Sequence, residues 1–576
     1  MVEVGLGGVD CVSYVGLITR LMPSSVSLES AEVHMVTECD REFHVGEYLV
    51  VESRGSNYLA RIAESRVEDI YSIAKTPVLS LDQELAMDVK YVPRLIKLEL
   101  ISECRNSDCG PPTKPPEIHS RVRVPGPGEV SRMLSLPSAG VVIGALALPN
   151  GSSLPDNQVL LPLDALRHHV LVVGTTGSGK TTLLKNLALE LVGNYGKVTV
   201  VSLDAVGHYH HLLLNNVDVR VLMPVTRGML RRYLGSGGDV KDLAHALVRD
   251  YVNSAFKSFG IRLGRARVRA RFARRRKGGV SVVREVRVMP GNLRAGVTII
   301  PWALRTRAIL YRVNDVTGML TEQARMFYGR VIKAVRDKVP GELTFRKIYN
   351  HLISPSEVQE RGRRLLNYEV IARDLGIHES TLQNIIRTIL AIIETGVVDV
   401  KRGNVVVPEP DYREALRPGY VVLHLANVLP MAQRVMVYRV LDVVYRFMGL
   451  EHLRDRERMS AVLVDEAHLF FPQTRSEDEK AMLERHLTRL TRLGRGRGIA
   501  VVFATHMPTD LNDAVIQLTN TKIVLRSDEK VLERLGIPSS ERRFLTTATA
   551  GLAYVTTFAY RYPVYVRITP RAYHVG

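Results

Sequence analysis

Cysteine is scarce in this sequence of 576 residues, which has four: Cys11, Cys39, Cys104 and Cys109. So few cysteines exclude a small scaffold built on disulfides. Cys104 and Cys109 are the only close pair, and a tetrahedral zinc site would need further Cys or His ligands that the sequence does not place nearby. We therefore expect ordinary free thiols.

Long apolar runs are also missing. No stretch of 18 apolar residues occurs, which argues against a membrane-spanning helix. The first residues, MVEVGLGGVDCVSY, lack the basic segment and apolar run of a secretory signal peptide. We therefore expect a cytoplasmic protein that needs no membrane.

Acidic residues are outnumbered, with 59 Asp and Glu against 78 Lys and Arg, for a net charge of +19. The composition, 46% hydrophobic and 24% charged, excludes global disorder. The length exceeds the roughly 250–300 residues of one hydrophobic core, so we expect several domains. The positive balance suggests a polyanionic partner, although basic surfaces also occur in proteins that bind no nucleic acid.

Apolar periodicity and turn residues divide the chain into segments. Between residues 169 and 206 an apolar run, a Gly-rich turn, a helical stretch and a second apolar run indicate a β–loop–α–β unit of an α/β domain. The predicted order is a small β-barrel (1–75), a connector with strands (76–160), the first part of the α/β core (161–224), a mostly helical insertion (225–415), the second part of the core (416–526) and a strand-rich end (527–576).

The Gly-rich turn, GTTGSGKT, matches the phosphate-binding pattern G-x-x-x-x-G-K-[ST] between a strand and a helix. Its glycines let the backbone N–H groups wrap a phosphate, and the helix N-terminus adds positive potential. Lys180 would reach the β- and γ-phosphates, and Thr181 would offer its hydroxyl to Mg²⁺. The predicted ATP-binding residues are Gly174, Thr175, Thr176, Gly177, Ser178, Gly179, Lys180, Thr181 and Thr182.

An apolar strand in AVLVDEAHLF, residues 461–470, ends in two acids. Asp465 is placed to hold Mg²⁺ through water, and Glu466 is placed to polarise an attacking water as general base. A strand that ends in Asp-Glu is a weak pattern alone, but together with the phosphate loop it indicates hydrolysis of a nucleoside triphosphate. The predicted catalytic set therefore includes Lys180 and Glu466.

A later strand ends at Thr505 and His506, where a γ-phosphate sensor would lie, and we count Thr505 among the predicted catalytic residues. The alternative is that these polar groups merely cap the strand end. Just before this strand, Arg489, Arg492, Arg495 and Arg497 cluster around glycines. Arg495 is our candidate for an arginine finger that reaches a neighbouring subunit's γ-phosphate, with a solvated basic turn as the alternative.

The segments RHHVLVVGTTGSGKTT, VVSLDAVGHYHHL, VLVDEAHLFFP and LGRGRGIAVVFATHMPTDL follow the barrel in an order that resembles the HerA family of archaeal hexameric DNA translocases, within the FtsK–HerA group of P-loop ATPases. The resemblance implies a RecA-like ATPase core with an N-terminal HAS-like β-barrel and a C-terminal brace. It further implies ATP and Mg²⁺, a homo-hexameric ring around double-stranded DNA, and a NurA-type nuclease partner. The implied role is resection of DNA ends in recombinational repair.

Two positions depart from the family pattern. After the second strand the family usually has an Asp-Pro-His-Gly-Glu-Tyr type segment, and here His208 replaces the acidic residue while Asp204 matches. The sensor is commonly Gln in an Ala-Thr-Gln-Arg-Pro type run; here Thr505 matches and His506 replaces the Gln. Both changes suggest a divergent member.

Two segments of the insertion are candidates for nucleic-acid contact. Residues 262–287 hold 11 Lys and Arg with one acid, and Arg265, Arg267, Arg269 and Arg271 alternate as on one face of a strand. We predict a basic hairpin with a turn at 277–279 whose arginines contact DNA phosphates; the alternatives are a solvated basic loop or a protein-binding surface. Residues 371–407 have a helix–turn–helix pattern, but the apolar second helix favours a helical bundle without DNA contact.

Two other functions stay open. A conjugation-type coupling ATPase that moves DNA or protein would need a membrane segment or membrane partner. A scaffold that uses ATP only to assemble on DNA would not need the general base Glu466.

Overall fold

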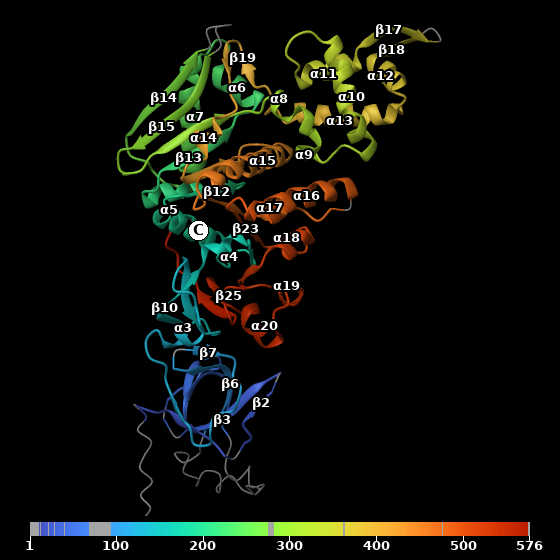
Figure 1. The fold of residues 1–576 in the computed structure, drawn as a ribbon. Helices are drawn as coiled ribbons and strands as arrows, with labels where there is room; N and C mark the ends of the chain where they lie inside the picture. Colours follow the sequence, from blue (N-terminus) through green and yellow to red (C-terminus); the bar gives the residue numbers. More distant parts are fainter. Residues whose placement is uncertain are drawn as a thin grey trace, which may run out of the picture. The chain divides into compact units, whose positions relative to one another are not determined.

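The computed structural model describes residues 11, 13–20, 22–27, 29–37, 39, 41–67, 94–106, 108–274, 281–360, 363–474 and 476–573. The chain divides into two compact units. Unit 1 is Met1–Ala165, Gly174–Gly179 and Thr521–Thr569, and unit 2 is Leu166–Val173, Lys180–Asn520 and Pro570–Gly576. The ribbon in Figure 1 carries the element labels used below.

Unit 1 contains a closed antiparallel barrel of six strands, because β3 pairs with β6 as well as with β1. Alternate residues such as Val33 and Met35 point into a fully buried core, as the period of two predicts. The sequence places a barrel in residues 1–75, whereas β6 and β8 lie beyond that range; residues 68–93 are outside the described part. The strands of this sheet are β1 (Gly16–Ile18), β2 (Ser25–Val26), β3 (Ala31–Thr37), β4 (Tyr48–Ser53), β5 (Ser56–Val67), β6 (Arg94–Arg105), β7 (Asp108–Gly110) and β8 (Arg121–Arg123).

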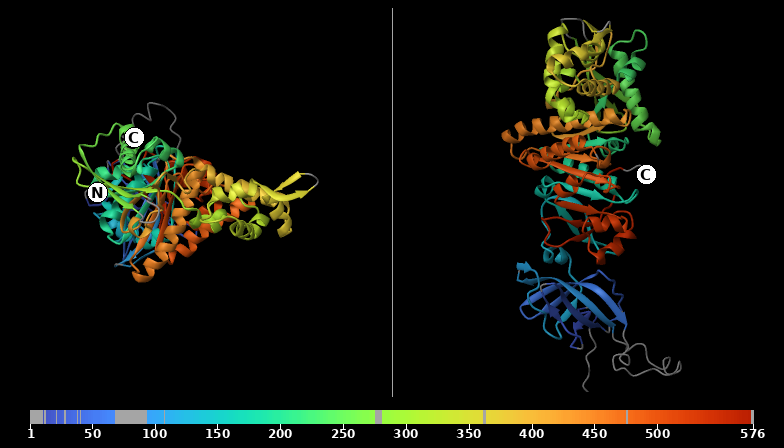
Figure 2. Two further views of the ribbon diagram at one scale, coloured as in Figure 1. Left: turned by 90° about the horizontal axis from the view of Figure 1, so that it is seen from above. Right: turned by 90° about the vertical axis from the view of Figure 1, so that its right-hand side faces the viewer.

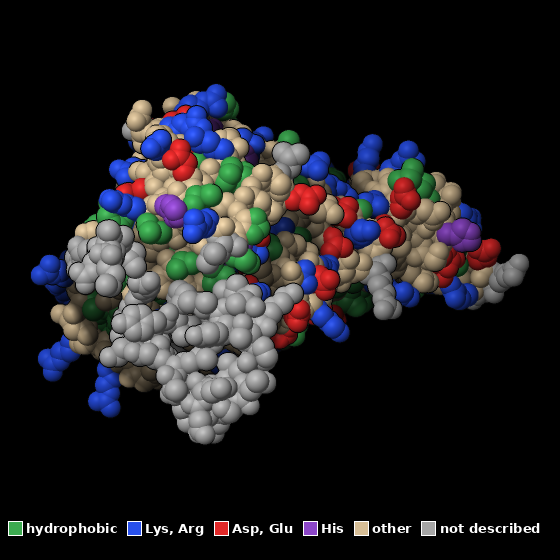
Figure 3. Space-filling model, turned by 90° about the horizontal axis from the view of Figure 1, so that it is seen from below, with side chains coloured by type: hydrophobic (Ala, Val, Ile, Leu, Met, Phe, Trp, Pro, Cys, Tyr) green, Lys and Arg blue, Asp and Glu red, His purple; other side chains and the backbone are tan. Residues whose placement is uncertain are grey.

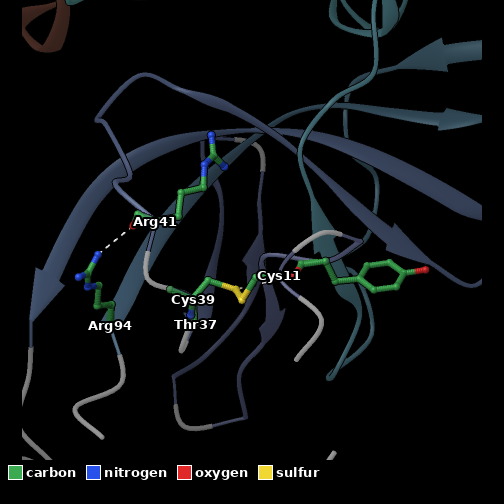
Figure 4. Close-up of a disulfide and its surroundings, with 6 residues drawn as sticks. Cys11, Thr37, Cys39, Arg41 and Arg94 are labelled. Atoms are coloured by element: carbon green, nitrogen blue, oxygen red, sulfur yellow. Dashed lines mark hydrogen bonds between the residues drawn. A yellow bond between two sulfur atoms is a disulfide. The ribbon is translucent and has the colours of Figure 1, made fainter. Parts of the chain in front are cut away.

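The expectation of free thiols is wrong, because the four cysteines form two disulfides, Cys11–Cys39 and Cys104–Cys109. Cys104 and Cys109 are register partners across the β6–β7 hairpin. Cys39 lies just after β3, and Figure 4 shows its bond to Cys11 near Arg41, whose carbonyl oxygen accepts a hydrogen bond from Arg94. Sequence spacing did not reveal these pairs because strand pairing brings the cysteines together.

A second group of strands in unit 1 joins segments that are far apart in the sequence, in the antiparallel order β10-β9-β26-β25-β24. The C-terminal strand β26 pairs with β9, with Tyr565 opposite Ala147. The elements are α3 (Glu129–Met133), β9 (Val141–Ala147), β10 (Ser153–Leu161), β24 (Thr521–Val524), α19 (Glu529–Arg534), α20 (Ser539–Thr546), β25 (Leu552–Thr556) and β26 (Val564–Arg567). The short helix α4 (Leu163–Arg167) follows β10.

Unit 2 is built on a parallel sheet in the order β11-β23-β22-β12-β21-β13. Every residue of β11, β12, β22 and β23 is buried, as expected for parallel strands with both faces covered. Their carboxyl ends therefore lie along one edge of the sheet. The strands are β11 (Val170–Val173), β12 (Val198–Asp204), β13 (Val219–Pro224), β21 (Gly419–His424), β22 (Met459–Val464) and β23 (Ile499–Thr505).

Helices surround this sheet. They are α5 (Lys180–Asn194), η2 (Tyr209–Asn215), α6 (Arg227–Leu234), α7 (Val240–Ala255), η3 (Lys257–Phe259), α14 (Tyr412–Ala415), α15 (Pro430–Arg454), η5 (Ala467–Leu469), α16 (Glu477–Leu490), α17 (Arg492–Arg495) and α18 (Asp513–Leu518). Pro430 begins α15, where its fixed φ and missing N–H are tolerated. After Thr569 the chain returns to unit 2, where Arg571 and Ala572 donate backbone N–H bonds to Asn186 of α5.

Residues 225–415 contribute both to the sheet and to a bundle of helices. β16 (Val297–Trp302), β15 (Ser281–Pro290), β20 (Val405–Val406) and β19 (Lys401–Arg402) extend the sheet beyond β13, and β14 (Ala266–Arg274) pairs with β15. The helices after β16 lie together in Figure 2. They are α8 (Thr306–Ile309), η4 (Leu310–Arg312), α9 (Val313–Thr317), α10 (Glu322–Lys338), α11 (Phe345–Ile353), α12 (Asn367–Leu375) and α13 (Glu379–Glu394), with the hairpin β17 (Pro355–Glu360) and β18 (Arg363–Leu366).

The helix–turn–helix pattern corresponds to α12 and α13, with Gly376 in the left-handed region between them. Leu382, Ile385 and Ile389 of α13 are fully buried among neighbouring helices. The apolar face of the second helix therefore packs inside the bundle.

Two further features of the described residues are the distribution of charged side chains and the character of the helices. On the face drawn in Figure 3, Lys and Arg side chains lie over the described part, with Asp and Glu side chains among them. In the described part of the chain, none of the helices combines the length and the apolar character that crossing a bilayer demands.

Candidate functional site

The phosphate-binding motif forms the connection between β11 and α5, as the sequence predicts. Gly177 and Gly179 have φ of +75° and +111°, a region that side chains with a Cβ rarely adopt. At Gly174 space is limiting, since a Cβ there would lie 2.4 Å from Ser178 Oγ. Within unit 1 the loop is held by hydrogen bonds from Thr175 N to Arg526 O at 2.8 Å and from Gly551 N to Ser178 O at 2.9 Å.

Lys180 begins α5 and is buried, with 6% of its surface exposed. Burial lowers the pKa of its amine, and the nearby carboxylates Glu466 and Asp465 counter that shift. Thr176 is exposed, and Thr175, Thr181 and Thr182 are partly buried. Lys180 therefore lies within electrostatic reach of both predicted acids.

Thr181 and Asp465 are brought together, since Thr181 Oγ1 donates a hydrogen bond of 3.0 Å to Asp465 Oδ2. Adjacent ligands of an octahedral Mg²⁺, each at about 2.1 Å, are separated by about 3 Å. These two oxygens therefore lie close enough to be neighbouring ligands of one Mg²⁺, whereas the sequence predicts that Asp465 would hold the ion through water. Burial raises the pKa of Asp465, as does Glu466, while hydrogen bonds from Tyr209 and Thr181 lower it.

Glu466, just past the end of β22, is surrounded by imidazoles. His506 Nδ1 lies 2.8 Å from Glu466 Oε2, and His468 Nδ1 lies 3.6 Å from the same oxygen. The rings of His468 and His506 meet edge to face at 4.9 Å. Glu466 has φ of +50°, an uncommon backbone conformation for a residue with a side chain, and such conformations are often found at functional sites.

Thr505, a predicted catalytic residue, is wholly buried at the end of β23. Its Oγ1 lies 3.2 Å from His468 Nδ1 and accepts a hydrogen bond from Met507 N at 3.1 Å. Thr505 therefore contacts the imidazole beside Glu466, and the predicted sensor His506 contacts Glu466 itself.

Two residues near the acids were missed in the sequence. Tyr209 donates a hydrogen bond of 3.0 Å from its hydroxyl to Asp465 Oδ2, and His468 joins Glu466 to Thr505. Tyr209 lies in the segment after β12 that resembles the family pattern, so that segment was the available clue. In the same segment His208 donates its backbone N–H to Asp204 at 3.1 Å and packs its ring against Phe259.

The arginines around α17 differ in their contacts. Arg489 and Arg497 both lie over the ring of Tyr445, at 4.7 and 4.0 Å from its centroid, and Arg489 also approaches Asp442. Arg492 and Arg495, at the two ends of α17, are exposed. Arg495, the candidate finger, therefore lies on the surface of this chain.

The predicted basic hairpin corresponds to β14 and β15, paired antiparallel; its turn at 277–279 is outside the described residues. Its four candidate DNA contacts, Arg265, Arg267, Arg269 and Arg271, are all exposed. Arg271 also lies 3.4 Å from Glu285 and 3.6 Å from Glu414. Acidic neighbours thus offset the charge of one of the four.

A phosphate-binding loop on the first strand of a parallel sheet, an acid pair on another strand and one strand between them define a RecA-like P-loop ATPase, so the predicted fold class is confirmed. The pattern of the family described as "Helicase HerA, central domain" matches residues 141–441, more than half of the chain. The chain belongs to this family. The predicted recognition is therefore also confirmed.

The similarity of this chain to individual known proteins either covers a short segment or has a low sequence identity. The chain is 40% identical over 65 residues to the DNA double-strand break repair helicase HerA of Pyrococcus furiosus, a segment that spans 11% of each protein. It is similar to VirB4 of Thermoanaerobacter pseudethanolicus (12% identity, 75% of this chain and 97% of that chain, TM-score 0.41). It is also similar to the bacterial conjugative coupling protein TrwB (13% identity, 79% and 94%, TM-score 0.43).

Proposed function

We propose that this protein is an ATP-driven translocase of double-stranded DNA that works as a homo-hexameric ring. The observation that carries this proposal is the convergence of Lys180, Thr181, Asp465 and Glu466 in a HerA-family core. Family membership supports a nucleotide-driven motor on DNA. Processing of DNA ends in recombinational repair, with a NurA-type nuclease as partner, is the finer part of the proposal.

ATP is held by the loop Gly174–Gly179 and by Lys180, whose ammonium neutralises charge on the β- and γ-phosphates. Thr181 and Asp465 hold Mg²⁺, which when bound neutralises charge that develops on the phosphate oxygens. Tyr209 keeps Asp465 in place through its hydroxyl, which lies 3.0 Å from Oδ2. The chain thus supplies positive charge to a reaction that depends on positioning and electrostatics.

Glu466 acts as general base toward a water that attacks the γ-phosphorus. His506 lies 2.8 Å from one oxygen of this carboxylate and restricts its rotation. Here His506 therefore orients the base, a role that differs from direct sensing of the γ-phosphate. Thr505 supports the second imidazole, His468, at 3.2 Å.

Glu466→Gln tests the proposal most directly. Because Gln cannot accept the proton, hydrolysis should fall by about 10²–10⁴-fold while ATP binding persists. Lys180→Ala should lose both. Hydrolysis is measured as phosphate release with and without long duplex DNA, and binding with a fluorescent ATP analogue. Glu477→Gln, on the exposed first turn of α16, removes a carboxylate outside the site and should behave as wild type.

A wild-type rate that does not respond to duplex DNA would contradict the motor. For the finer part, DNA-end degradation is measured with a NurA-type nuclease added to wild type or to Glu466→Gln. Degradation should require both ATP and an active Glu466, and degradation that is equal with the two proteins would contradict that part alone.

A further inference from the structure

A second group of titratable side chains in unit 2 consists of Asp204, His210 and His424, all fully buried. Asp204 ends β12 and His424 ends β21, and these parallel strands place the two residues opposite each other in register. His210 belongs to η2, which follows β12 after a turn. The three potential ligand atoms all lie within 4.8 Å of one another.

Most ring nitrogens of the two imidazoles lack a hydrogen-bond partner among the described residues; the exception is His424 Nε2, which lies 3.3 Å from Asn427 Nδ2. Among the described residues, none forms a hydrogen bond with either ring nitrogen of His210 or with Nδ1 of His424. His210 Nε2 has one charged neighbour, Asp204 Oδ2, at 3.1 Å. Native proteins rarely leave buried polar atoms unpaired, so these atoms call for a ligand that the chain itself does not supply.

The carboxylate of Asp204 is already oriented. Its Oδ1 accepts backbone N–H bonds from Gly207 at 2.7 Å and His208 at 3.1 Å, and Oδ2 accepts one from Tyr209 at 3.0 Å. Burial alone would raise the pKa of Asp204, but His210 and these N–H groups lower it below its usual range. Burial lowers the pKa of His424 to about 3.

We propose that Asp204, His210 and His424 bind a divalent transition-metal ion, and that this ion is zinc. Two imidazoles and one carboxylate are zinc ligands, whereas Mg²⁺ prefers oxygen ligands throughout. Tetrahedral zinc with bonds of about 2.0–2.1 Å separates its ligand atoms by about 3.4 Å, close to the 3.1 Å between His210 Nε2 and Asp204 Oδ2. The fourth position is left for water.

Such an ion has a structural consequence for the hydrolysis site. It joins the ends of β12 and β21 to η2, and η2 begins with Tyr209, whose hydroxyl contacts Asp465. The ring of Tyr251 from α7 packs edge to face on His210 at 5.3 Å and covers the group. The zinc therefore fixes the segment that positions Asp465.

The positive charge of Lys185 in α5 repels a metal ion bound by Asp204. The amine of Lys185 is wholly buried, forms no hydrogen bond with any described residue, and interacts electrostatically with Asp204. Burial lowers the pKa of Lys185 to about 8. Lys185→Met removes the charge and keeps a long side chain, so this variant should bind zinc more tightly than wild type.

The test measures metal content of the full-length protein. Protein purified without a metal-affinity tag is stripped with a chelator, dialysed against Zn²⁺ with excess Mg²⁺, and analysed by plasma mass spectrometry. Wild type should retain about one zinc ion per chain. The double variant His210→Gln/His424→Gln should retain at least tenfold less, while His468→Gln/His506→Gln, which removes the imidazoles beside Glu466, should retain as much as wild type.

Zinc that is absent from wild type, or equal in wild type and His210→Gln/His424→Gln, overturns the proposal. Because the double variant alters buried residues, a second measurement uses wild type alone. Cobalt added to the stripped protein should give the visible absorption of a tetrahedral site, and zinc but not Mg²⁺ with ATP should abolish it. Absence of that spectrum also overturns the proposal, and neither result depends on ATP hydrolysis.

Discussion

At the scale of single residues, the contacts of His506 indicate a role that differs from the one that the sequence predicts. The family pattern places Gln there, and the sequence predicts a γ-phosphate sensor. The imidazole instead lies 2.8 Å from Glu466 Oε2 and meets His468 edge to face. The contact with Glu466 restricts the rotation of the proposed general base, and the contact with His468 holds the imidazole of His506 in place.

His506→Ala should lower kcat roughly tenfold with little change in KM for ATP, because a base that rotates freely is misplaced more often. His506→Gln should stay within a few-fold of wild type, since the amide can still hydrogen-bond the carboxylate. Steady-state hydrolysis at saturating duplex DNA measures both parameters. If His506→Ala raised KM and left kcat intact, His506 would contact ATP and not orient the base.

Glu103 in strand β6 of the barrel predicts a pH dependence of stability. Its carboxylate accepts hydrogen bonds from Thr113 N at 3.0 Å, Thr113 Oγ1 at 2.7 Å and Ser56 Oγ at 2.9 Å. Burial alone would raise the pKa of Glu103, but these bonds and Arg105 lower it from 4.5 to about 2. Its contribution is therefore full above pH 4.5 and lost as the pH falls from 4.5 to 2.

Glu103→Gln should reduce the free energy of unfolding by up to about 3 kcal/mol at pH 6, and the difference from wild type should shrink toward pH 2. Chemical denaturation followed by circular dichroism at several pH values measures this. Glu32→Gln, in strand β3 of the same barrel, serves as the control. A constant difference between wild type and Glu103→Gln from pH 6 to pH 2 would contradict the assigned shift.

At the scale of elements, the hairpin β14–β15 carries the candidate DNA contacts. Arg267 and Arg269 are exposed on β14, where Arg269 faces Arg287 in register, so positive charge gathers along the hairpin. Arg271 faces Glu285, which offsets its charge. The hairpin therefore has a strongly positive part around Arg269 and Arg287, and a second part in which Glu285 offsets the positive charge of Arg271.

Arg267→Gln/Arg269→Gln should weaken duplex binding uniformly across sequences and lower the slope of log K against log salt by about 2, because each phosphate contact contributes about 0.9. Fluorescence anisotropy with labelled duplexes at several salt concentrations measures the slope. The matched control is Arg330→Gln/Lys333→Gln on the exposed face of α10, which removes the same charge. Equal slopes for the two double variants would assign the hairpin another role.

At the same scale, the barrel shows that the pairing of strands does not follow from the alternation of apolar residues in the sequence. Residues 31–37 and 48–53 alternate as strands and are strands in the structure. The closure of the barrel depends on β6 and β8, which lie beyond the segment that the sequence assigns to the barrel. Alternation identifies a strand, but it does not say which partner the strand takes.

At the scale of the whole molecule, the proposed ring makes hydrolysis depend on assembly. Arg495 is exposed at the end of α17, whereas the guanidinium groups of Arg489 and Arg497 lie over the ring of Tyr445. An arginine that reaches a neighbouring subunit's γ-phosphate must be free to leave its own chain's surface. Arg495 meets this requirement better than those two.

Arg495→Ala should lower hydrolysis by about 10³-fold while ATP binding persists, because the finger stabilises charge only in the transition state. Wild-type specific activity should rise with protein concentration as rings form. Phosphate release, with ring size followed by light scattering, checks both expectations. Arg492→Ala, at the other end of α17, is the control, and a comparable loss in that variant would mean that the effect is not particular to Arg495.

The sequence by itself determined the phosphate loop, the acid pair, the parallel core and the family, because glycine placement, strand burial and charge are written in short stretches of chain. The division into domains and the roles of the site residues stay predictions. Only the tertiary structure paired Tyr209 with Asp465, His506 with Glu466 and the cysteines with one another, and it buried Asp204, His210 and His424 together. Most of these contacts join residues that are distant in the chain, and the order of strands in a sheet, which sets them, depends on packing of the whole fold and not on any local pattern.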